Sequence, residues 1–276
     1  MNNKKFKNSL DLIIILFVAL IWALPIIWIL SLSFQPNDIL QKTTGNTAFG
    51  FIPYPFTVEN YIFLWKANFV TWFFNSFIVA ISMTVLTVIL SSFAGYAFAR
   101  IPFYGRNIIY FIVLAGLIVP GEILFIPMFT QFSTLGLNNS YIGLILPRLA
   151  VPFAVFVMTQ YYKGVPKDIE EASIIDGANR FQIFIKIMLP MSIPAMATVA
   201  IVTFGFAWKD YLWPIISVST QEMRTLQVGI ALQIGARIQE YMGTSLAGVI
   251  VSSIPTILLL IYFQKYLLRG FAIGTK

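Results

Sequence analysis

Long runs of apolar residues alternate with short polar segments along this chain. An α-helix that crosses a bilayer needs about 20 predominantly apolar residues. The runs of suitable length lie near residues 12–32, 72–98, 108–131, 141–162, 195–217 and 246–267. The pattern predicts an all-α, polytopic membrane protein with six transmembrane helices. The first run is long for a signal peptide, so we expect it to remain as an uncleaved anchor.

The polar residues of the chain are too few to cover a soluble core. Of the 276 residues, 58% are hydrophobic and 11% are charged, whereas soluble domains carry about 25% charged residues. The mean hydropathy is +0.83. No linker, low-complexity tract or long repeat divides the sequence. We therefore expect a single transmembrane domain over residues 1–276, in the plasma or inner membrane.

The basic residues predict the orientation, because lysine and arginine gather on the cytoplasmic side of a membrane. Most of them fall on the side that holds both termini. This group contains Lys4, Lys5, Lys7, Arg100, Arg106, Lys163, Lys167, Arg180, Lys186, Lys265, Arg269 and Lys276. The other side holds Lys42, Lys66, Lys209, Arg224 and Arg237, and Arg148 lies inside a span. We therefore expect cytoplasmic termini, and the net charge of +7 reflects topology rather than nucleic-acid binding.

Three segments are expected on the outer side. Residues 33–70 form a turn-rich loop that contains Gly45 and Gly50. Residues 132–140 form a short polar turn, and residues 218–245 form a longer connection with charges of both signs.

The chain contains neither cysteine nor histidine. Disulfides, thiolate nucleophiles, histidine bases and the usual zinc or haem ligands are therefore excluded. The sequence also lacks the Gly-x4-Gly-Lys-Ser/Thr run that binds ATP phosphates. We expect no metal and no cofactor in this chain. An intramembrane enzyme would need convergent carboxylates or a serine dyad within the spans, which Glu122 alone does not provide.

Residues 164–194 form the only sizeable stretch with several charges of both signs. Such a segment cannot lie in hydrocarbon and must project into water. Asp168 is expected to cap a first short helix, with Glu171 at the spacing of a capping box. Gly177 can adopt the left-handed conformation that ends a helix.

A second short helix is predicted from about residue 179 to residue 188. Phe181, Phe184 and Ile185 are expected on one side of it, and Pro190 is expected to stop it. The two helices would form a compact knob that docks a partner protein. The alternative is an amphipathic hairpin that lies on lipid headgroups, which the acidic residues disfavour but leave open.

This segment resembles the Glu-Ala-Ala loop of ABC importer permeases. The resemblance is carried by Glu171, Ala172, Gly177, Ile187, Leu189 and Pro190, with Ser173 as the third small residue. Asp176-Gly177-Ala178 has the form that is common among sugar permeases. The resemblance implies that a cytoplasmic ATPase contacts the loop. The residues implied in coupling are Glu170, Glu171, Ala172, Ser173, Asp176, Gly177, Ala178, Phe181, Ile187, Leu189 and Pro190.

The resemblance covers nearly the whole chain and is to the second permease subunit of carbohydrate importers, a group that contains maltose and glycerol-3-phosphate systems. Its further motifs are Asn75-Ser76, residues 95–100, residues 118–121 with Pro127, residues 208–214, residues 225–229 and the glycine-rich tail 270–276. Lys209 departs from it, because this position is expected to hold asparagine.

The resemblance also implies partners and a cargo. The partners are a second permease subunit in a heterodimer, two ATPase subunits that bind ATP and Mg, and an extracellular substrate-binding protein. Residues 218–245 are the candidate contact with the binding protein. The expected cargo is a carbohydrate, and the alternative is glycerol-3-phosphate or another small solute.

A few residues are candidates for the translocation path. Glu122 and Arg148 lie in or near spans, where ionisable groups are costly. They are expected either to pair or line a vestibule, or to snorkel to the headgroups. Lys209 and Asp210 are expected to mark the outer end of the fifth span. The candidate aromatic residues of the pore are Tyr96, Phe125, Phe156, Phe204 and Trp208.

Overall fold

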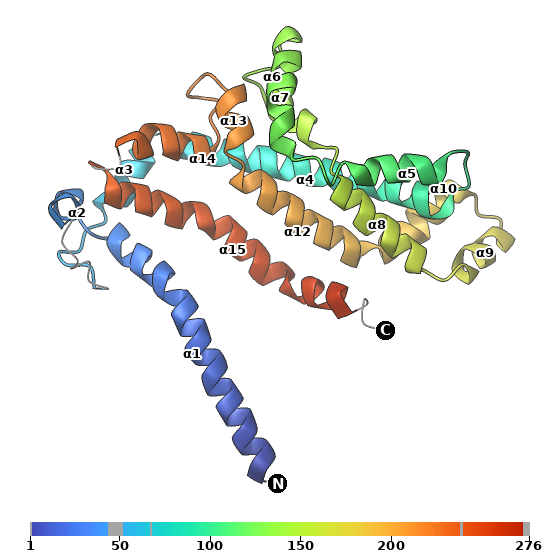
Figure 1. The fold of residues 1–276 in the computed structure, drawn as a ribbon, viewed down its shortest axis with the longest axis horizontal. Helices are drawn as coiled ribbons and strands as arrows, with labels where there is room; N and C mark the ends of the chain where they lie inside the picture. Colours follow the sequence, from blue (N-terminus) through green and yellow to red (C-terminus); the bar gives the residue numbers. More distant parts are fainter. Residues whose placement is uncertain (1, 44–51, 67, 238–239, 273–276) are drawn as a thin grey trace. The chain divides into compact units, whose positions relative to one another are not determined.

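The computed structural model describes residues 2–43, 52–66, 68–237 and 240–272. Within these ranges the chain forms helices and no β-strand (Figure 1). The sequence-predicted features at Gly45, Gly50 and residues 273–276 lie outside the described residues. The contacts group into two compact units, one of residues 1–71 and 229–254, the other of residues 72–228 and 255–276. A single transmembrane domain remains a prediction.

The first unit contains α1 (Asn2–Ser33), α2 (Asn37–Thr43), α3 (Glu59–Lys66), the π-helical turn η4 (Ile230–Ile234), η5 (Gly235–Arg237) and the start of α15 (Met242–Ala272). A buried amide joins its short elements. The Asn60 side chain, 1% exposed, donates hydrogen bonds to the carbonyls of Ser33 at 2.9 Å and Gln35 at 2.7 Å. Asn37 accepts a hydrogen bond from the Gly243 amide at 2.8 Å, which ties α2 to α15.

The second unit begins with α4 (Phe69–Arg100), α5 (Arg106–Ala115), η1 (Gly121–Leu124) and α6 (Phe125–Thr134). It continues with α7 (Tyr141–Ile145), η2 (Leu146–Arg148), α8 (Pro152–Gly164) and α9 (Asp168–Ile175). Then follow α10 (Arg180–Ile183), the π-helical turn η3 (Phe184–Met188) and α11 (Leu189–Met191). The last elements are α12 (Ile193–Lys209), α13 (Leu212–Ser217) and α14 (Leu226–Gly229).

Three described helices are long and apolar enough to cross a membrane, over Asp11–Ser33, Phe69–Arg100 and Met242–Phe263. They coincide with three of the predicted runs. Within the first of them, Trp22 is 77% exposed, as expected of a helix whose surroundings are lipid or another membrane subunit. These helices make the chain a multi-pass membrane protein.

The other predicted spans are not continuous helices. The fourth is bent by 50° between Arg148 and Pro152. The fifth, 195–217, is divided between α12 and α13 at residues 210–211, and a further bend of 71° at Ser192 precedes it. The third, 108–131, is interrupted between Ala115 and Gly121, because the residue before a proline avoids the α conformation and Pro120 follows Val119 here. These three runs are thus helical with breaks, and six crossings remain a prediction.

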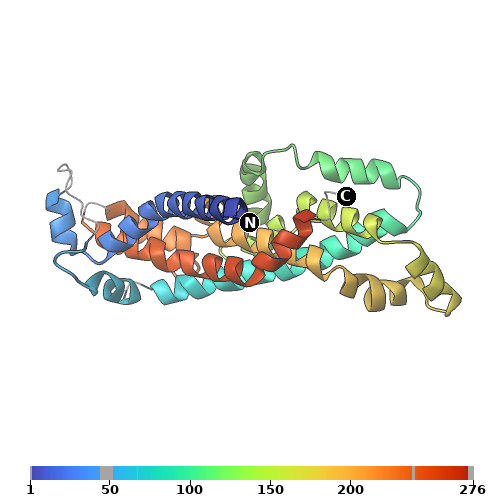
Figure 2. The ribbon, with the colours of Figure 1, turned by 90° about the horizontal axis from the view of Figure 1, so that it is seen from below.

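The core of the second unit joins α4, α8 and α12. Its buried members are Val88, Tyr96, Ala154, Met158, Tyr162, Val165, Ile183, Phe184, Met188, Ala195 and Val199. At Gly95 a Cβ atom would lie 2.6 Å from the Met158 Cβ, so only glycine permits this approach of α4 to α8. Figures 1 and 2 place α9 and α10 at one end of the unit, beyond the C-terminal end of α8.

Side chains fix a polar segment, residues 217–226, elsewhere in this unit. The Asn75 amide donates hydrogen bonds to the carbonyls of Glu222 at 2.6 Å and Arg224 at 2.9 Å. The indole of Trp72 donates to the Gln221 carbonyl at 3.0 Å. Asn75 also accepts a hydrogen bond from the Tyr141 hydroxyl at 2.6 Å. The first part of the predicted external connection is therefore held in one conformation.

Candidate functional site

Residues 168–191 form a hairpin of short helices, the α9–α11 hairpin. Its first helix starts one residue earlier than predicted: Lys167 is the N-cap residue, and no side chain caps the helix. Asp168 as a cap was therefore wrong. Asp168, Glu170 and Glu171 instead all lie in the first turn, where carboxylates are stabilised by the positive end of the helix dipole.

The turn of the hairpin is built at Gly177, as predicted. Its φ of +84° is left-handed. The Ala178 amide donates to the Ser173 carbonyl at 3.0 Å, and the Gly177 amide donates to the Ile174 carbonyl at 3.0 Å. This pair of bonds is the Schellman motif, which satisfies carbonyls at the end of a helix. Nothing lies within 4 Å of a Cβ placed at Gly177, so the demand for glycine is conformational rather than steric.

The second limb of the hairpin starts with a true capping box. The Asn179 side chain accepts from the Gln182 amide at 2.9 Å, and the Gln182 side chain accepts from the Asn179 amide at 2.9 Å. The spacing of these two residues could have revealed the box from the sequence. The limb does not stop at Pro190, contrary to the prediction, but runs to Met191. The π-helical turn before Pro190 alters the hydrogen-bond register, which accommodates a residue without an amide hydrogen.

The hairpin has a buried face and an exposed face. Ser173, Ile183 and Phe184 are 8%, 1% and 3% exposed, and the two apolar residues belong to the core. Ile175 and Phe181 are 84% and 65% exposed. The prediction that Phe181, Phe184 and Ile185 share one side is therefore wrong, because the chain passes from α-helix to π-helix at Phe184.

The remaining predicted coupling residues divide between these faces. Glu171, Ala172, Asp176, Gly177 and Pro190 are exposed, and Ala178, Ile187 and Leu189 are half-buried.

The two adjacent glutamates of α9 differ in their surroundings. The Oε1 atom of Glu170 lies 2.9 Å from the Nε atom of Arg100, and their side chains are 16% and 6% exposed. The Arg100 guanidinium also donates to the Val165 carbonyl, just after α8. Glu171 is exposed and forms no salt bridge within the described part of the chain. The sequence did not distinguish these two carboxylates.

The charged candidates for the translocation path do not pair with each other. Glu122 is exposed in η1. Arg148 lies 3.3 Å from the carboxylate of Asp210, and its guanidinium carbon is 5.6 Å from the centre of the Phe125 ring. The predicted option of a pair between Glu122 and Arg148 is thus wrong. Lys209 is the last residue of α12, and Asp210 is its C-cap; that this helix end lies on the outer side of the membrane remains a prediction.

Three of the five aromatic candidates pack inside the second unit, whereas Phe156 is 37% exposed and Phe125 is half-buried. Tyr96, Phe204 and Trp208 are 5%, 4% and 1% exposed. The rings of Tyr96 and Tyr162 meet edge to face at 5.7 Å, and those of Phe204 and Trp208 are stacked at 5.7 Å. Their role in translocation remains a prediction.

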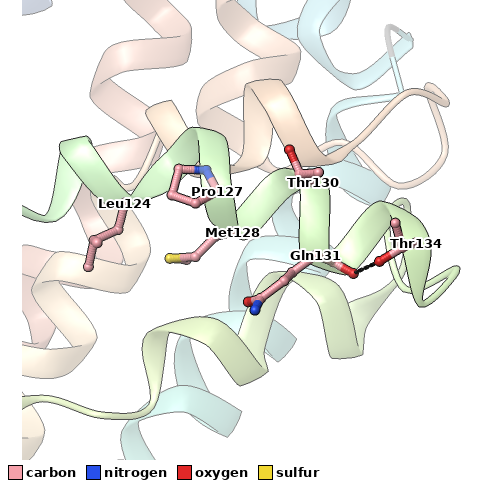
Figure 3. A pocket seen from close by; sticks show the side chains of 6 residues that line it. All are labelled: Leu124, Pro127, Met128, Thr130, Gln131 and Thr134. Carbon is pink, nitrogen blue, oxygen red and sulfur yellow. Dashed lines mark hydrogen bonds between the residues drawn. The ribbon is translucent and has the colours of Figure 1, made fainter.

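A surface hollow of about 490 Å³ lies along α6. Its lining residues, shown in Figure 3, are Leu124, Pro127, Met128, Thr130, Gln131 and Thr134. All come from one helical stretch, so the hollow is an open helix face without convergent charged groups. Within the described residues no three acidic side chains gather as metal ligands would.

Comparisons with known proteins identify the family. Residues 87–273 match the family described as binding-protein-dependent transport system inner membrane component. The chain is 36% identical to the arabinooligosaccharide transport permease AraQ of Halalkalibacterium halodurans, over 94% of this chain and 92% of that protein. It is 31% identical to the trehalose/maltose transport permease MalG of Thermococcus litoralis, over 99% and 98%.

A solved structure agrees with these relatives. A bacterial ABC transporter that imports the acidic polysaccharide alginate has a chain with a TM-score of 0.79 and 25% identity, over 96% of this chain and 98% of that chain. The resemblance read from the sequence is confirmed. This chain belongs to the binding-protein-dependent transport system inner membrane component family, the permease subunits of ABC importers.

Proposed function

We propose that this chain is a permease subunit of an ABC importer for a carbohydrate, and that a separate ATPase drives it through the α9–α11 hairpin. The observation that carries the proposal is the exposed apolar tip of the hairpin. Ile174, Ile175 and Phe181 are 55%, 84% and 65% exposed within a segment that also carries five acidic or basic residues in α9 and its flanks. Exposed apolar groups rimmed by charge mark protein interaction sites.

The hairpin suits a mechanical role more than a catalytic one. Its inner face is fixed in the core through Ile183, Phe184 and Met188, whereas Ile175 and Phe181 on its outer face are exposed. A protein that docks on this tip and moves would displace α9 and the π-helical turn together. ATP and Mg then belong to the partner, since the sequence contains no phosphate-binding loop.

Further partners follow from the family. We propose a second permease subunit, which completes the pathway, and two ATPase subunits, one on each permease. The description of the family as binding-protein-dependent supports an external substrate-binding protein. The ordered 217–226 segment is the part of the predicted external connection that we assign to this contact. Six crossings with cytoplasmic termini would place the segment and the hairpin on opposite sides.

A carbohydrate is the cargo that the relatives favour. Their names refer to arabinooligosaccharides, diacetylchitobiose and trehalose/maltose. A second candidate is another small solute, because a relative that is 29% identical is named for osmoprotective compounds. Competition of labelled trehalose or arabinooligosaccharide uptake by unlabelled solutes would separate the two.

Site-specific crosslinking tests the docking surface. The chain has no cysteine, so Ile175→Cys introduces a single thiol at the tip. Ile118, which is 83% exposed in the Ala115–Gly121 interruption, offers a matched control as Ile118→Cys. We expect a thiol crosslinker to join position 175, and not position 118, to a co-expressed ATPase. Equal yields from the two positions, or crosslinking of position 175 to lipid only, would contradict the proposal.

A further inference from the structure

We propose that Glu170 is not a contact for the ATPase but an inward anchor, and that its ion pair with Arg100 positions α9 on α4 and carries the movement of α9 into that helix. This inference rests on the proposed function for the transmission of movement. The positioning of α9 can be tested without an ATPase.

The geometry of the pair sets it apart from surface salt bridges. The Nε–Oε1 distance is 2.9 Å, with both side chains largely buried. The contact is one of opposite charges and not a hydrogen bond, because neither of these two atoms has a hydrogen-bond partner among the described residues. Breaking a buried pair by removing one partner is strongly destabilising, because the other charge is left without compensation. By contrast, the exposed pair of Lys42 and Asp38 spans 4.0 Å with side chains 77% and 66% exposed, and such pairs contribute little.

Arg100 also connects the end of α8 to the start of α9. Its guanidinium donates to the carbonyl of Val165, the residue that follows α8, and it contacts Glu170 in the first turn of the next helix. Arg100 is the last residue of α4. One side chain at the end of a long helix therefore fixes both the start of the loop and the helix that the loop presents.

The other limb reaches α4 through apolar packing. The ring of Tyr96, one turn before Arg100, lies 4.9 Å from the ring of Phe184, and the ring of Phe93 lies 4.9 Å from it as well. Dispersion contacts are individually weak, whereas a buried charge pair strongly penalises separation. Beside the packing of Ile169 on the core, the ion pair is thus the polar link that couples α9 to α4.

Glu171 supplies the matched control. It has the same side chain at the next position and is exposed, so Glu171→Gln tests the loss of one carboxylate without the loss of the anchor. The reversed pair, Arg100→Glu with Glu170→Arg, restores the charge attraction but not the hydrogen bond to the Val165 carbonyl, and so isolates the contribution of the ion pair. A third variant, Arg100→Met with Glu170→Met, removes both buried charges and leaves neither unpaired if Glu170→Gln alone fails to fold.

Hydrogen exchange of the purified chain tests the positioning. We expect amides of residues 169–175 to exchange about tenfold faster in Glu170→Gln than in Glu171→Gln, since loss of a buried pair outweighs loss of an exposed charge. The reversed pair should restore slow exchange, and the double Met variant should exchange fast. Equal exchange in Glu170→Gln, the double Met variant and Glu171→Gln would overturn the proposal.

Uptake per ATP hydrolysed, in proteoliposomes that contain the complete importer, tests the transmission. We expect Glu170→Gln to lower this ratio about tenfold, with recovery in the reversed pair. An unchanged ratio in Glu170→Gln or in the double Met variant would overturn the transmission. If the proposed function itself is wrong, the unmodified importer will show no ATP-driven uptake. That outcome differs from an unchanged ratio in the variants, and the hydrogen-exchange experiment would still test how α9 is positioned.

Discussion

The α9–α11 hairpin and the 217–226 segment connect helices of the same unit, yet they are held in opposite ways. Trp72 and Asn75 donate hydrogen bonds to main-chain carbonyls of the 217–226 segment, and Ser76 accepts one from its Leu226 amide. Apolar packing and one ion pair attach the hairpin, which leaves an apolar tip exposed. Polar bonds to the backbone specify one conformation, whereas an exposed apolar surface calls for a partner.

The two modes of attachment indicate two different roles for the 217–226 segment and the hairpin. A segment whose carbonyls are satisfied by buried side chains offers a preformed surface that need not change on binding. A hairpin held at its base by a charge pair can move as a body when its tip is displaced. The comparison predicts that substitutions in the first region act mainly on stability, and those in the second mainly on coupling.

The largest effect on stability is expected from Asn75→Ala. The substitution leaves the carbonyls of Glu222 and Arg224 and the hydroxyl of Tyr141 without their partner. These bonds are partly buried, and a group that loses its partner away from water costs about 1–3 kcal/mol. We expect a loss of about 3 kcal/mol in unfolding free energy and faster proteolysis of the 217–226 segment. The measurement is thermal unfolding of the chain in detergent.

Asn107→Ala is the control for this variant, because Asn107 is an exposed asparagine in α5. Its unfolding free energy should stay within about 0.5 kcal/mol of the parent. If Asn75→Ala were as stable as Asn107→Ala, the segment would not depend on its buried amide, and the contrast between the two regions would fail.

An intermediate effect is expected at two left-handed glycines, Gly177 in the hairpin and Gly136 in the turn after α6. They have φ values of +84° and +67°, and nothing lies within 4 Å of a Cβ at either position. Alanine at each should cost about 1–2 kcal/mol, since the penalty is conformational in both cases. Only Gly177→Ala should also lower uptake per ATP, because only Gly177 shapes the docking hairpin. Equal losses of uptake in the two variants would show that reduced stability, not the hairpin, limits transport.

The features that depend on neighbouring residues could be predicted from the sequence, and those that depend on distant residues could not. Gly177 was predicted because a helix end that needs a left-handed residue is a local property. The long helix over 72–98 was predicted because apolarity over about 20 residues reports burial or lipid contact. Apolarity does not report hydrogen-bond register, so the bend at Ser192 and the π-helical turn before it were missed.

The pairing of charges shows the same limit. Arg148 was recognised as a costly group inside a span, but its partner Asp210 lies 62 positions away and is joined to it only by the packing of the unit. Glu170 and Glu171 are neighbours with the same chemistry, and which of them faces α4 depends on where α9 starts. A start that differs by one residue rotates every side chain of a helix by about 100°.

The smallest effect on stability, with the sharpest effect on function, is expected from Phe181→Ala. Phe181 is 65% exposed, so its truncation should change the unfolding free energy by about 0.5 kcal/mol or less. Aromatic anchors often dominate protein interfaces, and the loss of one typically costs about 2 kcal/mol or more in binding. A loss of about 2 kcal/mol corresponds to a roughly 30-fold weaker affinity for the ATPase, which titration of the purified chain in nanodiscs would measure.

Phe111→Ala is the control for exposure, since Phe111 is 73% exposed on α5. The affinity of this variant for the ATPase should equal that of the parent chain. A loss of affinity in both variants would mean that exposed aromatic residues contribute to binding wherever they lie. A loss confined to Phe181→Ala would locate binding at the hairpin tip, the region whose stability does not need that side chain.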